Sequence, residues 1–168
     1  ASQGKSVALI CYNRALGVTN ELYFGDASNV KTGTFHAFFE RLFRNSLDEY
    51  LIEAASSYPD EDEWRVKKPF AYALALEEQA ELRFDAVIVD EAQDFSAEMW
   101  MPIQMLLKSD DSNFVAFADT NQALYSTVDH IPALSPPFLL HTNCRNTKEI
   151  HARAYERYSG PPISPPSL

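Results

Sequence analysis

Short apolar runs alternate with helical patterns along most of this chain, and that alternation limits the folds it can adopt. Short unbroken apolar runs are more typical of buried strands than of helices. We expect strands at Val7–Tyr12, Val30–Phe35, Phe84–Val89, Phe114–Ala118 and Phe138–Leu140. Strands separated by helices favour a mostly parallel sheet with helices on both faces. The sequence therefore predicts an α/β fold.

The segments between these strands carry helix signals. One apolar stripe at helical spacing consists of Phe35, Phe38, Phe39, Leu42 and Phe43. Pro69 suits the first turn of the next long helix, because its missing N–H is not needed there. Ser96 and Thr147 suit the N-cap positions of two further helices.

The stretch Gly4-Lys5-Ser6 resembles the end of a phosphate-binding loop, whose form is GxxxxGKS/T. In such a loop the Lys and the Ser or Thr begin a helix, so that the helix N-terminus faces the phosphates. Here the apolar run Val7–Tyr12 follows directly. We therefore predict a turn that leads into a strand rather than a phosphate-binding loop.

Composition narrows the function classes. A net charge of −10 argues against bulk electrostatic binding of nucleic acid, although a narrow groove with local basic residues remains compatible with it. Cys11 and Cys144 have no CxxC partner, so we expect neither a metal cluster nor a disulfide framework. No apolar run is long enough to cross a bilayer. We expect a cytoplasmic protein with no membrane partner.

The segment 44–83 interrupts the alternation, and we interpret it as a short helical insertion into a domain spanning 1–158. Its acidic runs, Asp60–Glu63 and Glu77–Glu78, are typical of solvated faces. The last stretch, 159–168, contains four prolines and no core pattern. It is typical of a linker towards another domain.

The strongest sign of chemistry is Asp90-Glu91, at the end of the predicted strand Phe84–Val89. In open parallel sheets, ligands bind at the carboxyl ends of the strands. One carboxylate can hold Mg²⁺ while the other takes a proton from an attacking water, as in hydrolytic nucleotide sites. Gln93 and Asp94 extend the polar cluster. The alternative is an acidic loop that caps the next helix.

Two further polar residues follow predicted strands. Gln122 comes after Phe114–Ala118, where it could sense a phosphate or orient a water. Arg145 precedes a helix, where it could neutralise developing phosphate charge. The alternatives are a plain turn around Asp119 and a surface ion pair for Arg145.

Two strand-to-helix junctions, ICYNRAL and TFHAFF, could contact nucleic acid. Their polar and aromatic side chains are Tyr12, Asn13, Arg14, Thr34, Phe35 and His36. Tyr12 or Phe35 could stack on bases, and the others could contact phosphates. The structural alternatives are helix caps for Asn13 and Thr34, core packing for Phe35, and a hydrogen-bonded core histidine for His36.

Five motifs occur in one fixed order: ICYNRAL, TFHAFF, VIVDEAQD, ADTNQALY and LHTNCRNT. In this order they resemble the first RecA-like ATPase domain of a superfamily 1 DNA helicase of the UvrD/Rep type, over residues 7–157 apart from the insertion. The resemblance implies an ATP-dependent DNA helicase or translocase. It also implies ATP and Mg²⁺ as ligands and single-stranded DNA as the partner.

The resemblance further implies a role for each site residue. Asp90 would bind the Mg²⁺ of Mg-ATP, and Glu91 would be the catalytic base. Gln122 would contact the γ-phosphate and couple it to DNA through Tyr125, while Arg145 would act as an arginine finger. The DNA contacts would come from Tyr12, Asn13, Arg14, Thr34, Phe35 and His36.

Several family features are not found among these residues. The phosphate-binding loop with its strand and the second RecA-like domain are missing, and Cys144 stands where the family usually has Tyr. We therefore expect an incomplete sheet, and a fragment that hydrolyses ATP negligibly on its own. An exposed sheet edge would favour self-association. The alternative is a degenerate helicase-like module that binds DNA or protein without ATPase activity.

Overall fold

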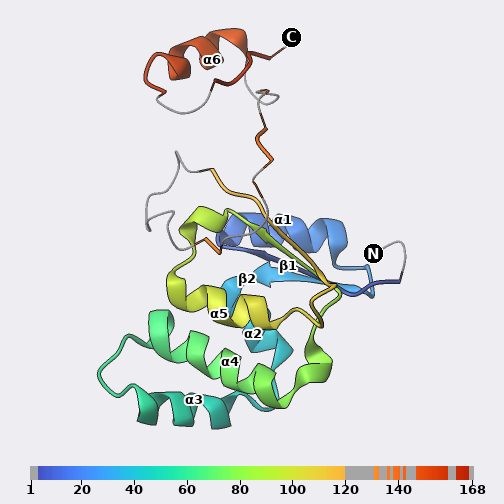
Figure 1. Ribbon diagram of the computed structural model, residues 1–168, viewed down its shortest axis with the longest axis vertical. Helices are drawn as coiled ribbons and strands as arrows, with labels where there is room; N and C mark the ends of the chain where they lie inside the picture. The colour runs from blue at the N-terminus through green and yellow to red at the C-terminus, as the bar shows by residue number, and fades with distance from the viewer. Residues whose placement is uncertain are drawn as a thin grey trace. The chain divides into compact units, whose positions relative to one another are not determined.

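A sheet of four parallel strands, in the order β2-β1-β3-β4, forms the centre of the first unit of the chain (Figure 1). The computed structural model describes residues 4–119, 131–132, 136, 138–140, 142, 147–158 and 162–166. The strands are β1 (Val7–Cys11), β2 (Val30–Thr34), β3 (Ala86–Asp90) and β4 (Asn113–Ala116). The predicted α/β fold with a parallel sheet is confirmed.

Helices cover both faces of this sheet, as the alternation predicts. On one face lies α1 (Arg14–Phe24); on the other lie α2 (Phe35–Leu42), α4 (Lys68–Glu78) and α5 (Ala97–Met105) (Figure 1). An outer helix, α3 (Leu47–Ser57), packs on α4. The short helices are the π-helix η1 (Glu63–Lys67) and the 3₁₀ turns η2 (Ala80–Leu82) and η3 (Ala92–Asp94).

Local sequence explains how the first elements begin. Gly4 has a φ of +75° in the bend before β1, which confirms the predicted turn into a strand. Asn13 is the N-cap of α1, and its side-chain oxygen accepts a hydrogen bond from the Ala15 N–H at 2.8 Å. Phe38 and Phe39, from the predicted apolar stripe, lie on the buried face of α2.

One apolar core joins the sheet to α2, α4 and α5. Strands β1 and β3 supply it with Ile10 and Val89, which are fully buried. The ring of Phe39 stacks on that of Tyr72 in α4, with centroids 4.7 Å apart and planes 9° apart. Because α4 lies within the predicted insertion 44–83, part of that segment shares the core of the sheet. The limits of the insertion and of the domain, 1–158, stay predictions.

The opposite face of the sheet is covered unevenly. Thr32, Leu9, Ile88 and Val115 lie side by side across the four strands. Thr32 is buried, Leu9 and Ile88 are half-buried, and Val115 is 43% exposed. Within the described residues β4 pairs only with β3, so it forms an edge of the sheet. Self-association through this edge stays a prediction.

Residues Ala133–Leu168 form a second compact unit, which contains α6 (Lys148–Tyr155). The Thr147 hydroxyl accepts a hydrogen bond from the Ile150 N–H at 3.4 Å, which confirms the predicted N-cap. The predicted strand Phe138–Leu140 is wrong, because these exposed residues have no regular secondary structure. An apolar run becomes a strand only where another strand completes its hydrogen bonds. No described helix is long and apolar enough to cross a membrane.

A pair of side-chain and backbone contacts ties the start of β1 to the start of β3. The Asp85 carboxylate accepts hydrogen bonds from the Ser6 N–H at 2.8 Å and the Ser6 hydroxyl at 2.9 Å. The Ser6 oxygen in turn accepts the Asp85 N–H at 3.1 Å. The hydrogen bond from the Ser6 backbone, followed by that from its side chain, lowers the pKa of Asp85.

We expect Asp85→Asn to lower the thermal unfolding midpoint at pH 7. A carboxyl whose pKa is lowered by folding stabilises the protein above its ordinary pKa of about 3.9, and this contribution is lost as the pH falls through the lowered value. The difference between the two proteins should therefore shrink as the pH approaches that range. Asp110→Asn, on an exposed carboxylate, is the control. A difference that is constant with pH would contradict the prediction.

We expect Leu76→Ala to reduce the free energy of unfolding by about 2–5 kcal/mol, the usual cost of a cavity in a packed core. Leu76 lies in α4 and is fully buried. Urea unfolding should remain a single transition, because α4 shares the core of the sheet. Ile52→Ala, on the exposed face of α3, should change stability by less than about 0.5 kcal/mol. A separate early transition would show that 44–83 unfolds independently.

Candidate functional site

The predicted carboxylate pair lies at the carboxyl end of β3. Asp90 is the last residue of the strand, and Glu91 follows with φ 54° and ψ 45°. Glu91 is the one non-glycine residue with positive φ in the described part of the chain. A left-handed backbone in such a residue costs about 1–3 kcal/mol and is found most often at functional sites. The Glu91 N–H donates to the Asp90 carboxylate at 3.0 Å.

A buried amide holds the Glu91 side chain. Gln93, which is 2% exposed, donates from its side-chain nitrogen to the Glu91 carboxylate at 2.7 Å. Its oxygen accepts the Asp119 N–H at 3.0 Å. Gln93 therefore connects the end of β3 to the chain that follows β4. The sequence placed Gln93 in the polar cluster but gave no sign of this bridging role.

Several acidic groups lie close together at this edge of the sheet. Burial, and then the charge of Asp90, raises the pKa of the Cys11 thiol to about 11. Burial, and then the charge of Glu91, raises the pKa of Asp94, one of whose carboxylate oxygens is buried without a hydrogen-bond partner. The site therefore favours a bound cation.

The carboxylate oxygens here are ligands that suit Mg²⁺. The described residues contain no cluster of three or more His, Cys, Asp or Glu side chains that could hold a metal. Mg²⁺ is ordinarily bound by one or two carboxylates, with water and substrate phosphates as its other ligands. Asp90 and Glu91 therefore fit Mg²⁺ that arrives with a nucleotide better than a permanently bound ion.

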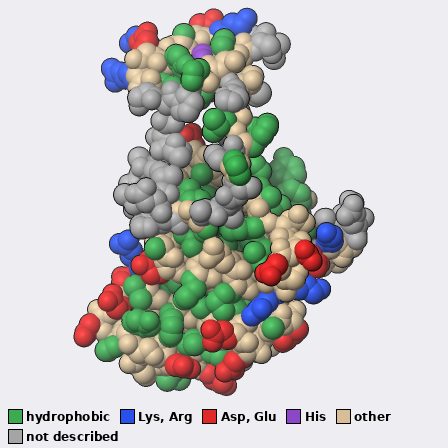
Figure 2. Space-filling model, in the orientation of Figure 1, with side chains coloured by type: hydrophobic (Ala, Val, Ile, Leu, Met, Phe, Trp, Pro, Cys, Tyr) green, Lys and Arg blue, Asp and Glu red, His purple; other side chains and the backbone are tan. Residues whose placement is uncertain are grey.

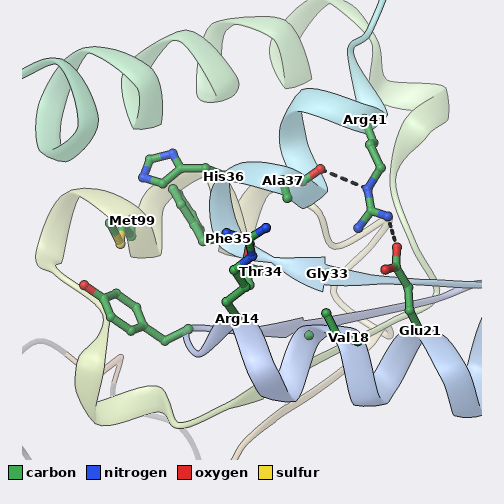
Figure 3. Close-up of a pocket in the computed structure, with 12 residues that line it drawn as sticks. Arg14, Val18, Glu21, Gly33, Thr34, Phe35, His36, Ala37, Arg41 and Met99 are labelled. Atoms are coloured by element: carbon green, nitrogen blue, oxygen red, sulfur yellow. Dashed lines mark hydrogen bonds and ion pairs between the residues drawn. The ribbon is translucent and has the colours of Figure 1, made fainter.

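A groove of about 580 Å³ lies beside this edge, between α1, the end of β2 and the start of α2 (Figure 3). Its lining includes five of the residues predicted from the two strand-to-helix junctions, namely Tyr12, Arg14, Thr34, Phe35 and His36. The fold thus brings together two motifs that are about twenty residues apart in the sequence. The remaining candidate of the first junction, Asn13, has its side chain at the N-cap of α1, as the structural alternative for it expects.

Two residues of the groove present groups that suit phosphate. Thr34 is at the N-cap position of α2, but its side chain makes no capping hydrogen bond. The first-turn N–H groups of α2 are therefore not capped by that side chain, and a helix N-terminus attracts anions. Arg14 makes no hydrogen bond or ion pair within the described residues, and its side chain projects between α1 and Thr34 in Figure 3.

Phe35 is a core residue that also lines the groove, and its predicted contact with DNA stays a prediction. It is 2% exposed and packs edge-on against Phe39, Tyr72 and Phe95. The core alternative is therefore correct for its side chain. Tyr12, which is partly exposed and packs edge-on against Phe95, keeps a ring surface at the groove.

His36 is a hydrogen-bonded histidine. Its Nδ1 lies 3.2 Å from the Tyr72 hydroxyl. Burial, followed by the charge of Lys68, lowers its pKa to about 4, although Glu40 opposes this shift. A neutral imidazole attracts phosphate much less than a charged one, so His36 contributes to the groove through its shape and its hydrogen bonds.

The other end of the groove is closed by an ion pair that the sequence did not reveal. Arg41 pairs with Glu21 of α1 and donates to the backbone oxygens of Ala37 at 3.1 Å and Thr32 at 2.7 Å (Figure 3). These contacts join α1, β2 and α2. In the sequence, neither Arg41 nor Glu21 differs from an ordinary charged surface residue. Only the fold identifies them as a pair.

The remaining predicted site residues lie outside the described residues. They are Gln122, Tyr125 and Arg145. Their predicted roles at the γ-phosphate and along DNA stay predictions.

Comparison with known families gives one match. The model of the UvrD/REP helicase N-terminal domain matches residues 64–127, a range that includes α4, the Asp90-Glu91 pair, α5 and β4. Apart from Met99, the residues that line the groove precede the matched range. No curated protein matches the chain.

We expect the imidazole of His36 to titrate near pH 4, well below the ordinary histidine pKa of about 6.5. Its NMR ring signals should therefore stay constant from pH 7 to about pH 5. Because folding lowers the pKa of His36, the fold favours the neutral imidazole. The contribution of His36 to the free energy of unfolding therefore falls as the pH drops from about 6.5 towards 4. His36→Gln assigns the signals by their loss. A midpoint near 6.5 would contradict the buried, neutral state.

Proposed function

We propose that this chain is part of the motor of an ATP-dependent DNA helicase or translocase, because the model of the UvrD/REP helicase N-terminal domain matches residues 64–127. The chemical step is hydrolysis of ATP, coupled to movement along single-stranded DNA. The sequence contains no GxxxxGKS/T segment. We therefore assign the activity to the natural protein that contains this chain, and negligible hydrolysis to these residues alone.

The observation that carries the proposal is the geometry of Glu91. Its backbone is held in the left-handed region, and its carboxylate accepts a hydrogen bond from Gln93. A general base works when it is fixed in position and its unprotonated form is retained. Glu91 would take the proton of the water that attacks the γ-phosphate.

Asp90 is the residue that would hold Mg²⁺. When bound, this ion would neutralise charge on the phosphates of ATP. The negative field felt by the Cys11 thiol and by Asp94 supports a cation at this place. Asp90 also accepts the Glu91 N–H, so the ligand and the base are joined directly.

Coupling to DNA would pass through the segment after β4. Gln93 bonds both the Glu91 side chain and the Asp119 N–H. Asp119 begins the motif in which Gln122 would contact the γ-phosphate and Tyr125 would contact DNA. Arg145 would stabilise the charge that develops on the γ-phosphate. A shift at the phosphate could then be transmitted to the DNA side of the domain.

The groove between α1 and α2 would hold the DNA backbone. Arg14, the Thr34 hydroxyl and the N–H groups at the start of α2 supply phosphate donors. Tyr12 supplies a partly exposed ring for a base. The net charge of −10 means that these local donors, rather than the overall field, must attract the strand.

The test is ATP hydrolysis by the natural protein that contains this chain, measured with and without single-stranded DNA. We expect DNA to stimulate hydrolysis, and Glu91→Gln to reduce the rate by about 10²–10⁴-fold, because the base is lost while the shape of the side chain is kept. Asp110→Asn, at an exposed carboxylate distant in sequence, should leave the rate unchanged.

Two results would overturn the proposal. DNA-stimulated hydrolysis that persists in Glu91→Gln would exclude Glu91 as the base. DNA binding without hydrolysis in the natural protein would favour a helicase-like binding module that has lost its ATPase activity.

A further inference from the structure

An exposed tryptophan stands on the short π-helix η1, close to the groove. Trp64 is 52% exposed, although tryptophan is usually among the more buried residues. Its backbone is fixed, because the Asp62 carboxylate accepts the Trp64 N–H at 2.9 Å and the Arg65 N–H at 2.7 Å. π-helical turns of this kind occur frequently at functional sites.

The indole of Trp64 is supported from one side. The Lys68 ammonium lies over the ring, 3.4 Å from its centroid. Lys68 is itself buried and pairs with Glu40 at 2.7 Å, so the cation is held in place. Since Trp64 is 52% exposed even with Lys68 over its ring, part of the indole remains open to a ligand.

His36 connects Trp64 to the groove. Its imidazole lines the groove and meets the indole edge-on, with ring centroids 5.1 Å apart. In Figure 3 His36 and Arg41 lie on opposite sides of the view. The Arg41 end is closed by the pair with Glu21, whereas the His36 end continues to the exposed indole.

Local charge at Trp64 is more favourable to nucleic acid than the adjacent acidic run suggests. The stretch Glu63–Lys68 contains one acidic and three basic residues. Arg65 follows Trp64 directly, and its guanidinium makes no hydrogen bond or ion pair within the described part of the chain. The Asp62 carboxylate, by contrast, is engaged in the hydrogen bonds that cap η1.

We propose that Trp64 is a base-stacking residue that extends the groove, with the base of a single strand lying on the exposed part of the indole and Arg65 beside its phosphate. The inference rests on the proposed function, because it requires DNA in the groove. A flat ring backed by a fixed cation, with a free guanidinium beside it, matches a nucleotide better than it matches an apolar partner. The base is recognised by its π-face, so little sequence preference is expected.

Tryptophan fluorescence reports on this contact directly. The chain has two tryptophans, and Trp100 is 3% exposed, so quenching by DNA reports mainly on Trp64. The full chain is titrated with an oligonucleotide of about 12 thymidines, long enough for a groove of this kind. The affinity for the same oligonucleotide, carrying a dye, is measured by anisotropy. We expect quenching on binding.

The variants separate the inference from the proposed function. Trp64→Leu should abolish the quenching and weaken binding by about 5–150-fold, the range for one stacked base, whereas Trp64→Phe should recover most of the affinity. Tyr23→Leu is the matched control, because Tyr23 is an exposed aromatic residue that does not line the groove. It should bind as the unchanged protein does.

Each other outcome has a definite meaning. If Arg14→Ala weakens binding while Trp64→Leu binds normally, DNA uses the groove and the stacking role of Trp64 is wrong. If the chain binds DNA and neither substitution matters, the strand lies elsewhere and both proposals fail for this groove. If no DNA binds at all, the DNA-binding part of the proposed function fails, and a protein partner becomes the explanation for the exposed indole.

Discussion

The parallel hydrogen bonding of β3 to both β1 and β4 is the constraint on which the rest of the structure depends. The pairing of β3 with β1 aligns Asp90 with Cys11, and the pairing of β1 with β2 extends this row to Thr34. The carboxylates and the start of α2 therefore share one edge of the sheet. A slip of one residue in β3 would turn Asp90 to the other face and Val89 out of the core. Burial of Val87 and Val89 thus fixes where the acidic site lies.

From this edge, two polar contacts extend the site beyond the strands. Gln93 reaches the segment after β4, and the His36 imidazole reaches the Tyr72 hydroxyl of α4. Both depend on side chains that are mostly buried, where an unmade hydrogen bond is costly. The carboxyl edge of the sheet and the groove are therefore each held in place by contacts with buried side chains.

The sequence predicted what depends on local pattern. Apolar runs located four strands to within about two residues, and the stripe through Phe38 and Phe39 located α2. Prediction from the sequence failed where the structure depends on residues that are distant in the sequence. Phe138–Leu140 has the pattern of a strand but lacks regular structure, and the bridging role of Gln93 depends on Asp119, which is 26 residues away. The sequence context of Asn13 allowed both a helix cap and a contact with DNA; the structure shows the cap, and the contact with DNA stays a prediction.

The contacts of Arg41 have a consequence for how the groove would respond to salt. Because its guanidinium is already engaged by Glu21 and two carbonyl oxygens, it adds little charge for a bound strand. Each phosphate that a cation neutralises releases counterions. On a single strand, each such contact adds about 0.7 to the steepness with which log affinity falls against log salt concentration. With Arg14 as the principal unpaired cation of the described lining, a strand in the groove would release few counterions. Its affinity would then depend only weakly on ionic strength.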